Sequence, residues 1–242
     1  MRYTSTRARR EFDNWIIDAQ VLLRAAQKHE SLLRIVADSI LCASLFLTHA
    51  RFENYFRDIV SFAIEKVNGG NFPSKSLPGR LRAAQLNSQI PHPHLKHYYI
   101  YSNERLLLDR LHDAITESDW LWALANYNGK VQPSIVIGQR GYPSVENLKG
   151  VFYKLGIDII PECNRRLKTD IAAMIDGISD LRGEMAHLGM PPGITGNDVE
   201  DKIDNLKKIV HVIDRVVHEN FVRPSKRQLA LKVKRAERDR LK

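Results

Sequence analysis

The chain has 242 residues, of which 43% are hydrophobic and 27% charged, and its formal net charge is +9. This length and composition allow one ordinary hydrophobic core, so the chain is expected to fold. The richest apolar run, residues 39–52, is interrupted by polar side chains before it reaches the length of about 18 residues that suits a membrane span. The basic N-terminus lacks the apolar core of a signal peptide. These features predict a soluble, cytoplasmic protein with no membrane association.

The two cysteines, Cys42 and Cys163, lie far apart in the sequence, and no CxxC pair is present. A zinc site needs a second cluster of ligands, which the chain does not offer. We therefore expect two reduced thiols that pack as small apolar side chains, and neither a metal nor a cofactor.

Positive charge is concentrated at the C-terminus. Residues 223–242 contain nine Lys or Arg and two acidic residues, which gives this segment +7 of the net charge of +9. Such segments attract RNA through phosphate contacts and counterion release, although a solvated helical extension has the same composition. The sequence thus divides into a helical domain at 1–222 and a basic tail at 223–242.

Helical periodicity dominates, and no two strand-like runs are joined by a hairpin turn, so the sequence predicts an all-α fold. An amphipathic helix is expected over residues 9–28. A longer helix over 31–67 is apolar on most sides between 35 and 52, which predicts that it is the central element. The Asn-Gly-Gly at 68–70 is a suitable stop.

Residues 71–101 are rich in Pro, Ser and His, which predicts an irregular insertion with a short helix near 79–88. Another helix is expected over 103–127. Residues 128–143 have the composition of a loop, in which Ser-Ile-Val-Ile is expected to form a short extended piece.

Capping residues predict the boundaries of the next helices. Ser144 is the expected N-cap of a short helix that Gly156 ends. Pro161 is expected to open a further helix, whose apolar stripe leads directly to Arg182 and His187.

The final core helix is expected to begin at Asn197 as N-cap, with Glu200 completing a capping box, and to end near Phe221.

Arg182 and His187 stand in the segment DLRGEMAHLGMPPG, at the end of a long apolar stripe and before a Pro-Pro-Gly turn. Their spacing alone is weak evidence, because with 22 Arg and 9 His in the chain about one such pair arises by chance at any offset. Two other pairs match the same pattern: Arg24/His29 and Arg105/His112. Arg24/His29 suits a helix C-terminus, and Arg105/His112 suits a charged helix face. Only Arg182/His187 therefore has the context of a functional site.

The stretch LRGEMAHLG resembles the signature of HEPN domains, in which an Arg, four to six residues and a His close the penultimate helix of an all-α bundle. The segments HARFENYFRDIV and YPSVENLKGVFYKLG are similar in order and character, and the likeness covers most of residues 10–221. The branch most resembled is the RiboL-PSP-HEPN group of prokaryotic defence and toxin-type proteins. The resemblance implies a HEPN-like bundle, to which the residues of this chain add a long central helix, an irregular insertion and a basic C-terminal extension.

Two positions depart from the family pattern. Gly183 stands where active members often carry Asn or another polar residue, and glycine weakens a helix. Gly189 stands two residues after the histidine, where HEPN toxins that are silenced by nucleotidylation have Tyr, so that mode of regulation is not supported.

The resemblance implies metal-independent RNA cleavage, in which the 2′-hydroxyl attacks the adjacent phosphorus and leaves a 2′,3′-cyclic phosphate. His187 is the candidate for acid–base work, since an unperturbed imidazole titrates near pH 6.5. Arg182 is the candidate for stabilising charge on the non-bridging oxygens, since a guanidinium is a permanent cation with a planar fork of donors.

Five residues of an ideal helix leave two side chains about 140° apart. One helix therefore does not easily bring Arg182 and His187 to a single phosphate, so either the helix ends between them or two subunits contribute. The family forms its site at a homodimer cleft, and this implies a homodimer with two Arg/His pairs across a two-fold axis.

Other chemistry-bearing residues have simpler readings. Glu53 is either a partner of Arg182 or an exposed carboxylate on a long helix, and the second is favoured. The His- and Tyr-rich segment at 92–101 is read as an edge loop whose aromatic side chains could stack on unpaired bases.

We therefore expect a homodimeric endoribonuclease in a toxin or phage-defence setting, with RNA as substrate and an antitoxin or defence protein as possible partner. One alternative is a catalytically inert HEPN-like module that binds RNA or protein, for which Gly183 is the best hint. The other is a helical adaptor without affinity for nucleic acid.

Overall fold

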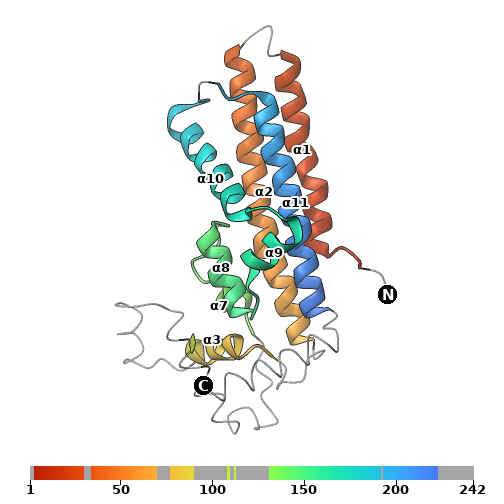
Figure 1. The fold of residues 1–242 in the computed structure, drawn as a ribbon, viewed down its shortest axis with the longest axis vertical. Coiled ribbons are helices and arrows are strands. Elements are labelled where there is room, and N and C mark those ends of the chain that lie inside the picture. Colours follow the sequence, from red (N-terminus) through yellow and green to blue (C-terminus); the bar gives the residue numbers. More distant parts are fainter. Residues whose placement is uncertain are drawn as a thin grey trace. The chain divides into compact units, whose positions relative to one another are not determined.

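The structure is a computed structural model that describes residues 3–29, 34–69, 77–89, 108, 109, 112, 131–191 and 193–222. All regular elements in these ranges are helices, which confirms the all-α prediction (Figure 1). The His- and Tyr-rich segment, the basic tail and nearly all of the helix predicted over 103–127 lie outside the described residues. The domain boundary predicted at residue 222 stays a prediction.

The chain forms two compact units, and each is described by itself. The first unit comprises Met1–Ile59, Gly141–Leu148 and Ile159–Val216, and the second comprises the remaining segments. The helices of the first unit are α1 (Arg7–His29), most of α2 (Arg34–Asn68), α9 (Ile159–Leu167), α10 (Ile171–Leu188) and most of α11 (Gly196–Phe221).

Three long helices, α1, α2 and α11, run side by side in the first unit (Figure 1). The amphipathic helix predicted over residues 9–28 is confirmed in α1, because Phe12, Ile16, Ala19, Leu23 and Ala26 are all buried at helical spacing. Each large apolar side chain buried in this way stabilises the fold by roughly 1.5–3 kcal/mol. Buried apolar residues on the other two helices include Leu41, Leu45, Phe52, Tyr55, Val199, Ile203, Leu206 and Val210.

The helix α2 is long and apolar enough to cross a membrane by length and composition. Part of that composition serves the fold, since its residues Leu45, Phe52 and Tyr55 are buried. Its polar groups are also used internally: the Ser44 hydroxyl donates to the carbonyl of Ala19 on α1 at 2.8 Å. The central position expected for this helix is therefore confirmed.

The helix expected from Pro161 to His187 is interrupted, and this prediction was wrong in its continuity. The helical conformation is interrupted between α9 and α10, where Lys168 has a left-handed φ of 55°. Asp170 is the N-cap of α10 and accepts hydrogen bonds from the backbone N–H groups of Ala172 at 3.0 Å and Ala173 at 3.4 Å. A capping aspartate accepts hydrogen bonds from backbone N–H groups that have no partner within the helix, so Asp170 stabilises a new helix N-terminus at this point.

The start of α11 also differs from the prediction. Thr195, not Asn197, caps the helix: its backbone N–H and hydroxyl donate to the Asp198 carboxylate at 2.8 and 2.7 Å. The Asp198 backbone N–H donates back to the Thr195 hydroxyl oxygen at 3.3 Å. This reciprocal pair is a capping box formed two residues earlier than expected, and Glu200 instead accepts from Gln27 on α1 at 3.3 Å.

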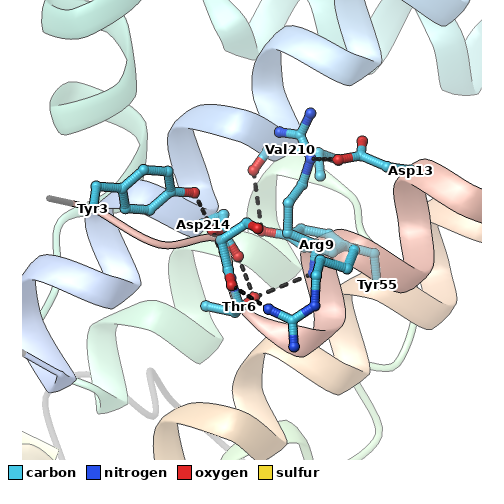
Figure 2. A network of polar contacts seen from close by, with 9 residues as sticks. Tyr3, Thr6, Arg9, Asp13, Tyr55, Val210 and Asp214 are labelled. Atoms are coloured by element: carbon cyan, nitrogen blue, oxygen red, sulfur yellow. Dashed lines mark hydrogen bonds and ion pairs between the residues drawn. The ribbon is translucent and has the colours of Figure 1, made fainter.

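A buried polar network fixes the residues that precede α1 (Figure 2). Asp214 on α11 is fully buried and accepts hydrogen bonds from the Tyr3 hydroxyl, the Thr6 hydroxyl and the Thr6 backbone N–H. The Thr6 hydroxyl oxygen in turn accepts from the backbone N–H of Arg9 at 3.2 Å, as the N-cap of α1 does. A buried carboxylate is stable only with such partners, so the network specifies how α1 meets α11.

The second unit contains α3 (Gly79–Gln89), α7 (Pro133–Ile137) and the end of α8 (Val145–Lys154). The helix expected near 79–88 is confirmed. The extended piece expected in Ser-Ile-Val-Ile is wrong, because Pro133 stands in the first turn of α7 and favours a helix start there.

Both predicted ends of α8 are confirmed. At its start, in the first unit, the Ser144 hydroxyl accepts from the backbone N–H of Asn147 at 3.2 Å. After its end, in the second unit, Gly156 adopts a positive φ of 72°, which glycine tolerates without strain.

Candidate functional site

Arg182 and His187 both lie on α10, which continues unbroken past them to Leu188. Arg182 is half-buried and His187 is exposed, whereas Met185, which lies between them in the sequence, is buried. On an ideal helix the two side chains are about 140° apart and about 7.5 Å apart along the axis. A single copy of α10 therefore does not direct both side chains to one point, and the helix does not end between them.

Gly183 does not interrupt the helix, which runs through it in regular α conformation. A Cβ atom placed on Gly183 would meet nothing within 4 Å. The helix ends instead at Gly189, whose φ is 76° and whose N–H donates to the carbonyl of Met185 at 3.2 Å. His187 thus stands in the last turn, where a cationic imidazolium interacts favourably with the helix dipole.

The guanidinium of Arg182 packs against two aromatic rings. Its central carbon lies 5.9 Å from the ring centroid of Phe46 on α2 and 5.9 Å from that of Tyr142, which precedes α8. Both rings are half-buried, and a cation over the face of such a ring is attracted by its quadrupole. In the described part of the chain, Arg182 forms no ion pair with a carboxylate.

His49 completes this cluster and was missed by the sequence reasoning. Its imidazole stacks on the ring of Tyr142, with centroids 4.8 Å apart and an angle of 25° between the rings. The residue is only 3% exposed. Burial, reinforced by the nearby charge of Arg182, lowers the pKa of His49 to about 4, so its imidazole is neutral at neutral pH. A histidine inside the apolar run of α2 was the available signal.

The backbone of Tyr142 is held by the start of α8. Its carbonyl accepts hydrogen bonds from the backbone N–H of Ser144 at 3.0 Å and from the side-chain amide of Asn147 at 2.8 Å. Tyr142 is therefore fixed by its backbone as well as by its ring. We define the arginine cluster as Phe46, His49, Tyr142 and Arg182.

Glu53 is not the partner of Arg182. Its carboxylate accepts from the guanidinium of Arg57, one turn further along α2, at 2.5 Å. Glu53 is therefore a side chain on the polar face of α2, as the favoured alternative predicted.

The two other Arg/His matches lie elsewhere. Arg24 is exposed in the C-terminal part of α1, and His29 is the last residue of that helix, as expected for a helix end. Arg105 lies outside the described residues.

Cys42 and Cys163 are free, as expected, and Cys163 is buried. Burial raises the pKa of the Cys163 thiol to about 12, which keeps it protonated. Among the described residues, no group of three or more His, Cys, Asp or Glu is placed to hold a metal ion.

Comparison with known proteins gives one finding. The family model described as RiboL-PSP-HEPN matches residues 16–219, which include the arginine cluster and His187. No curated protein and no solved structure gave a match. HEPN proteins are often ribonucleases, so the match indicates a nuclease-type or RNA-related domain.

Proposed function

Because the chain belongs to the RiboL-PSP-HEPN family, we propose that it is a metal-independent endoribonuclease whose working residues are Arg182 and His187. The substrate is RNA, and the products are a 2′,3′-cyclic phosphate and a 5′-hydroxyl end. The setting proposed is a toxin or phage-defence system, with an antitoxin or defence protein as the regulatory partner.

The observation that carries this proposal is the position of Arg182. Its cation is held against aromatic rings, which contact it through their π faces and use none of its N–H groups as conventional hydrogen-bond partners. Those groups form a planar fork suited to two oxygens of a phosphate. A phosphate is therefore the chemical group that this arginine is best prepared to bind.

The reaction needs one proton removed and one supplied. In our proposal His187 takes the proton of the 2′-hydroxyl, whose oxygen attacks phosphorus while the bond to the 5′-oxygen breaks. The leaving 5′-oxygen takes up a proton from water, and His187 then returns its proton to the resulting hydroxide. Arg182 stabilises the charge that develops on the non-bridging oxygens.

The geometry of α10 supports a homodimeric site. Since Arg182 and His187 diverge on one continuous helix, a second copy of α10 across a two-fold axis supplies the missing partner for each. In this arrangement the arginine of one subunit works with the histidine of the other.

The test is incubation of a mixed RNA pool with wild type, Arg182→Ala and His187→Ala in excess EDTA, with analysis of the 3′ ends. We expect cyclic phosphate ends with wild type and a loss of about 100-fold or more with each variant, since acid–base groups and charge stabilisation each contribute on this scale. Matched controls are Arg24→Ala and His211→Ala, which change exposed residues on other helices. These should cleave like wild type.

Cleavage that requires a divalent cation, or that survives His187→Ala, would contradict the proposal. If neither wild type nor variants cut RNA, but RNA is retained and released by salt in proportion to the charge of residues 223–242, the inert binding module is the better description.

A further inference from the structure

An arginine that must meet a phosphate in one orientation needs something that holds it. The side chain of Arg182 has about 2 kcal/mol of rotamer entropy to lose, so a site in which it moves freely binds and aligns a phosphate poorly. On α10 the residues one turn away from Arg182 are Ile178, Ser179, Met185 and Ala186, which carry no acidic or aromatic side chain. Restraint has to come from other segments.

The restraint comes from α2 and from the segment before α8. Phe46 and Tyr142 each place a ring centroid 5.9 Å from the guanidinium carbon of Arg182. Phe46 is part of a long central helix, so its backbone is fixed by the fold. Tyr142 lies in the short connection between α7 and α8, and its position therefore requires its own support.

That support has two parts. The ring of Tyr142 stacks on His49, which is buried in α2, with a centroid separation of 4.8 Å. The carbonyl of Tyr142 is tied to Ser144 and Asn147 at the start of α8. The tyrosine ring thus contacts both a buried imidazole and the guanidinium, and the backbone of Tyr142 is held as well.

The charge state of the buried imidazole matters for this arrangement. A cationic His49 would repel the nearby guanidinium of Arg182. Burial keeps the pKa of His49 low, so its imidazole is neutral at neutral pH, and Arg182 is the only cation of the arginine cluster.

We propose that Tyr142 is a positioning residue: its ring, backed by His49, fixes the guanidinium of Arg182 in the orientation that receives the RNA phosphate. The inference rests on the proposed function for its catalytic consequence, but the ordering of Arg182 is a separate physical claim. Since the contact uses the face of the ring, phenylalanine fulfils the same role and leucine does not.

The experiment combines two readouts on Tyr142→Phe and Tyr142→Leu. The first is cleavage of a defined RNA, with kcat and KM determined separately. The second is the NMR order parameter of the Arg182 Nε–H group, assigned by its loss in Arg182→Lys, which needs no activity. The matched control is Tyr153→Leu in the second unit, where another tyrosine ring lies 3.9 Å from a guanidinium carbon, that of Arg80.

We expect Tyr142→Phe to behave like wild type in both readouts. Tyr142→Leu should lower the order parameter of Arg182 and reduce kcat about 10-fold to 100-fold with a smaller change in KM, because misplacing a catalytic group by about 1 Å has effects of this size. Tyr153→Leu should leave the Arg182 signal and kcat unchanged, and thermal unfolding reports whether each variant is folded.

Three outcomes would overturn the inference. An unchanged order parameter in Tyr142→Leu shows that the ring does not restrain Arg182, whatever happens to kcat. Equal losses in Tyr142→Phe and Tyr142→Leu show that the hydroxyl group matters instead. A lower order parameter with unchanged kcat shows that ordering has no catalytic use. If wild type cuts no RNA, the proposed function fails, while the order parameters still decide whether Tyr142 holds Arg182.

Discussion

At the scale of single residues, the arginine cluster shows what the sequence reveals and what it hides. Arg182 and His187 are recognisable because their spacing and context are local and match a family signature. Their neighbours are not, because Phe46, Tyr142 and Arg182 come from three segments separated by tens of residues. No local pattern states that His49 will stack on Tyr142, since that contact exists only after the helices have packed.

The pH dependence of stability follows from the buried His49. Its pKa is about 4 in the folded chain and about 6.5 in the unfolded chain. Between about pH 4 and about pH 6.5, His49 is therefore protonated in the unfolded chain and neutral in the folded chain. The free energy of unfolding should therefore fall as the pH decreases from about 6.5 towards 4. We expect His49→Phe to lose part of this decrease.

Chemical denaturation of wild type and His49→Phe at about pH 7 and about pH 5 measures the effect. The stability difference between the two proteins should shift in favour of the variant at the lower pH. An identical decrease in both proteins would show that His49 does not remain neutral in the fold.

At the scale of elements, the sequence predicts helices well and their junctions less well. The stripes of α1, α2 and α11 are long enough for their periodicity to be unambiguous. The break between α9 and α10 spans only a few residues, and the apolar stripe continues across it, so Asp170 was the only local sign of a new start. Thr195 and Asn197 are both residue types that cap helices, and Thr195 is the cap because Asp198, three residues later, forms reciprocal hydrogen bonds with it.

The helix α10 offers a matched pair of glycine substitutions. Gly183→Ala adds a methyl group in open space within a regular helix, so it should raise the free energy of unfolding by about 0.5–1 kcal/mol. Gly189→Ala also adds a methyl group in open space, but it forces alanine into a φ of 76° and should lower stability by about 1–3 kcal/mol.

Urea denaturation of both variants, monitored by circular dichroism, tests this contrast. The opposite signs are the essential result, because both sites have the same free space and differ only in backbone conformation. Stabilisation by both substitutions would show that Gly189 does not adopt a positive φ at the end of α10.

At the scale of the whole molecule, the proposed site requires two chains. If the arginine of one subunit works with the histidine of the other, two inactive variants complement each other when mixed. An equimolar mixture of Arg182→Ala and His187→Ala should recover about a quarter of wild-type cleavage, since half of the dimers are mixed and each keeps one complete site.

The mixture should be prepared by unfolding and refolding the two variants together, so that subunits exchange. A mixture of Arg182→Ala with the double variant Arg182→Ala/His187→Ala serves as the control and should remain inactive. If mass spectrometry confirms mixed dimers but the mixture does not cleave RNA, each Arg/His pair would have to act within one subunit.

The network around Asp214 bears on how the protein folds. Its partners, Tyr3 and Thr6, precede α1, whereas Asp214 lies on α11, about 200 residues later in the chain. Closing so long a loop costs conformational entropy, and that cost is offset only when the two helices pack together. Local helix formation in α1 and α11 should therefore precede the Asp214 network, and the buried carboxylate should gain its partners late in folding.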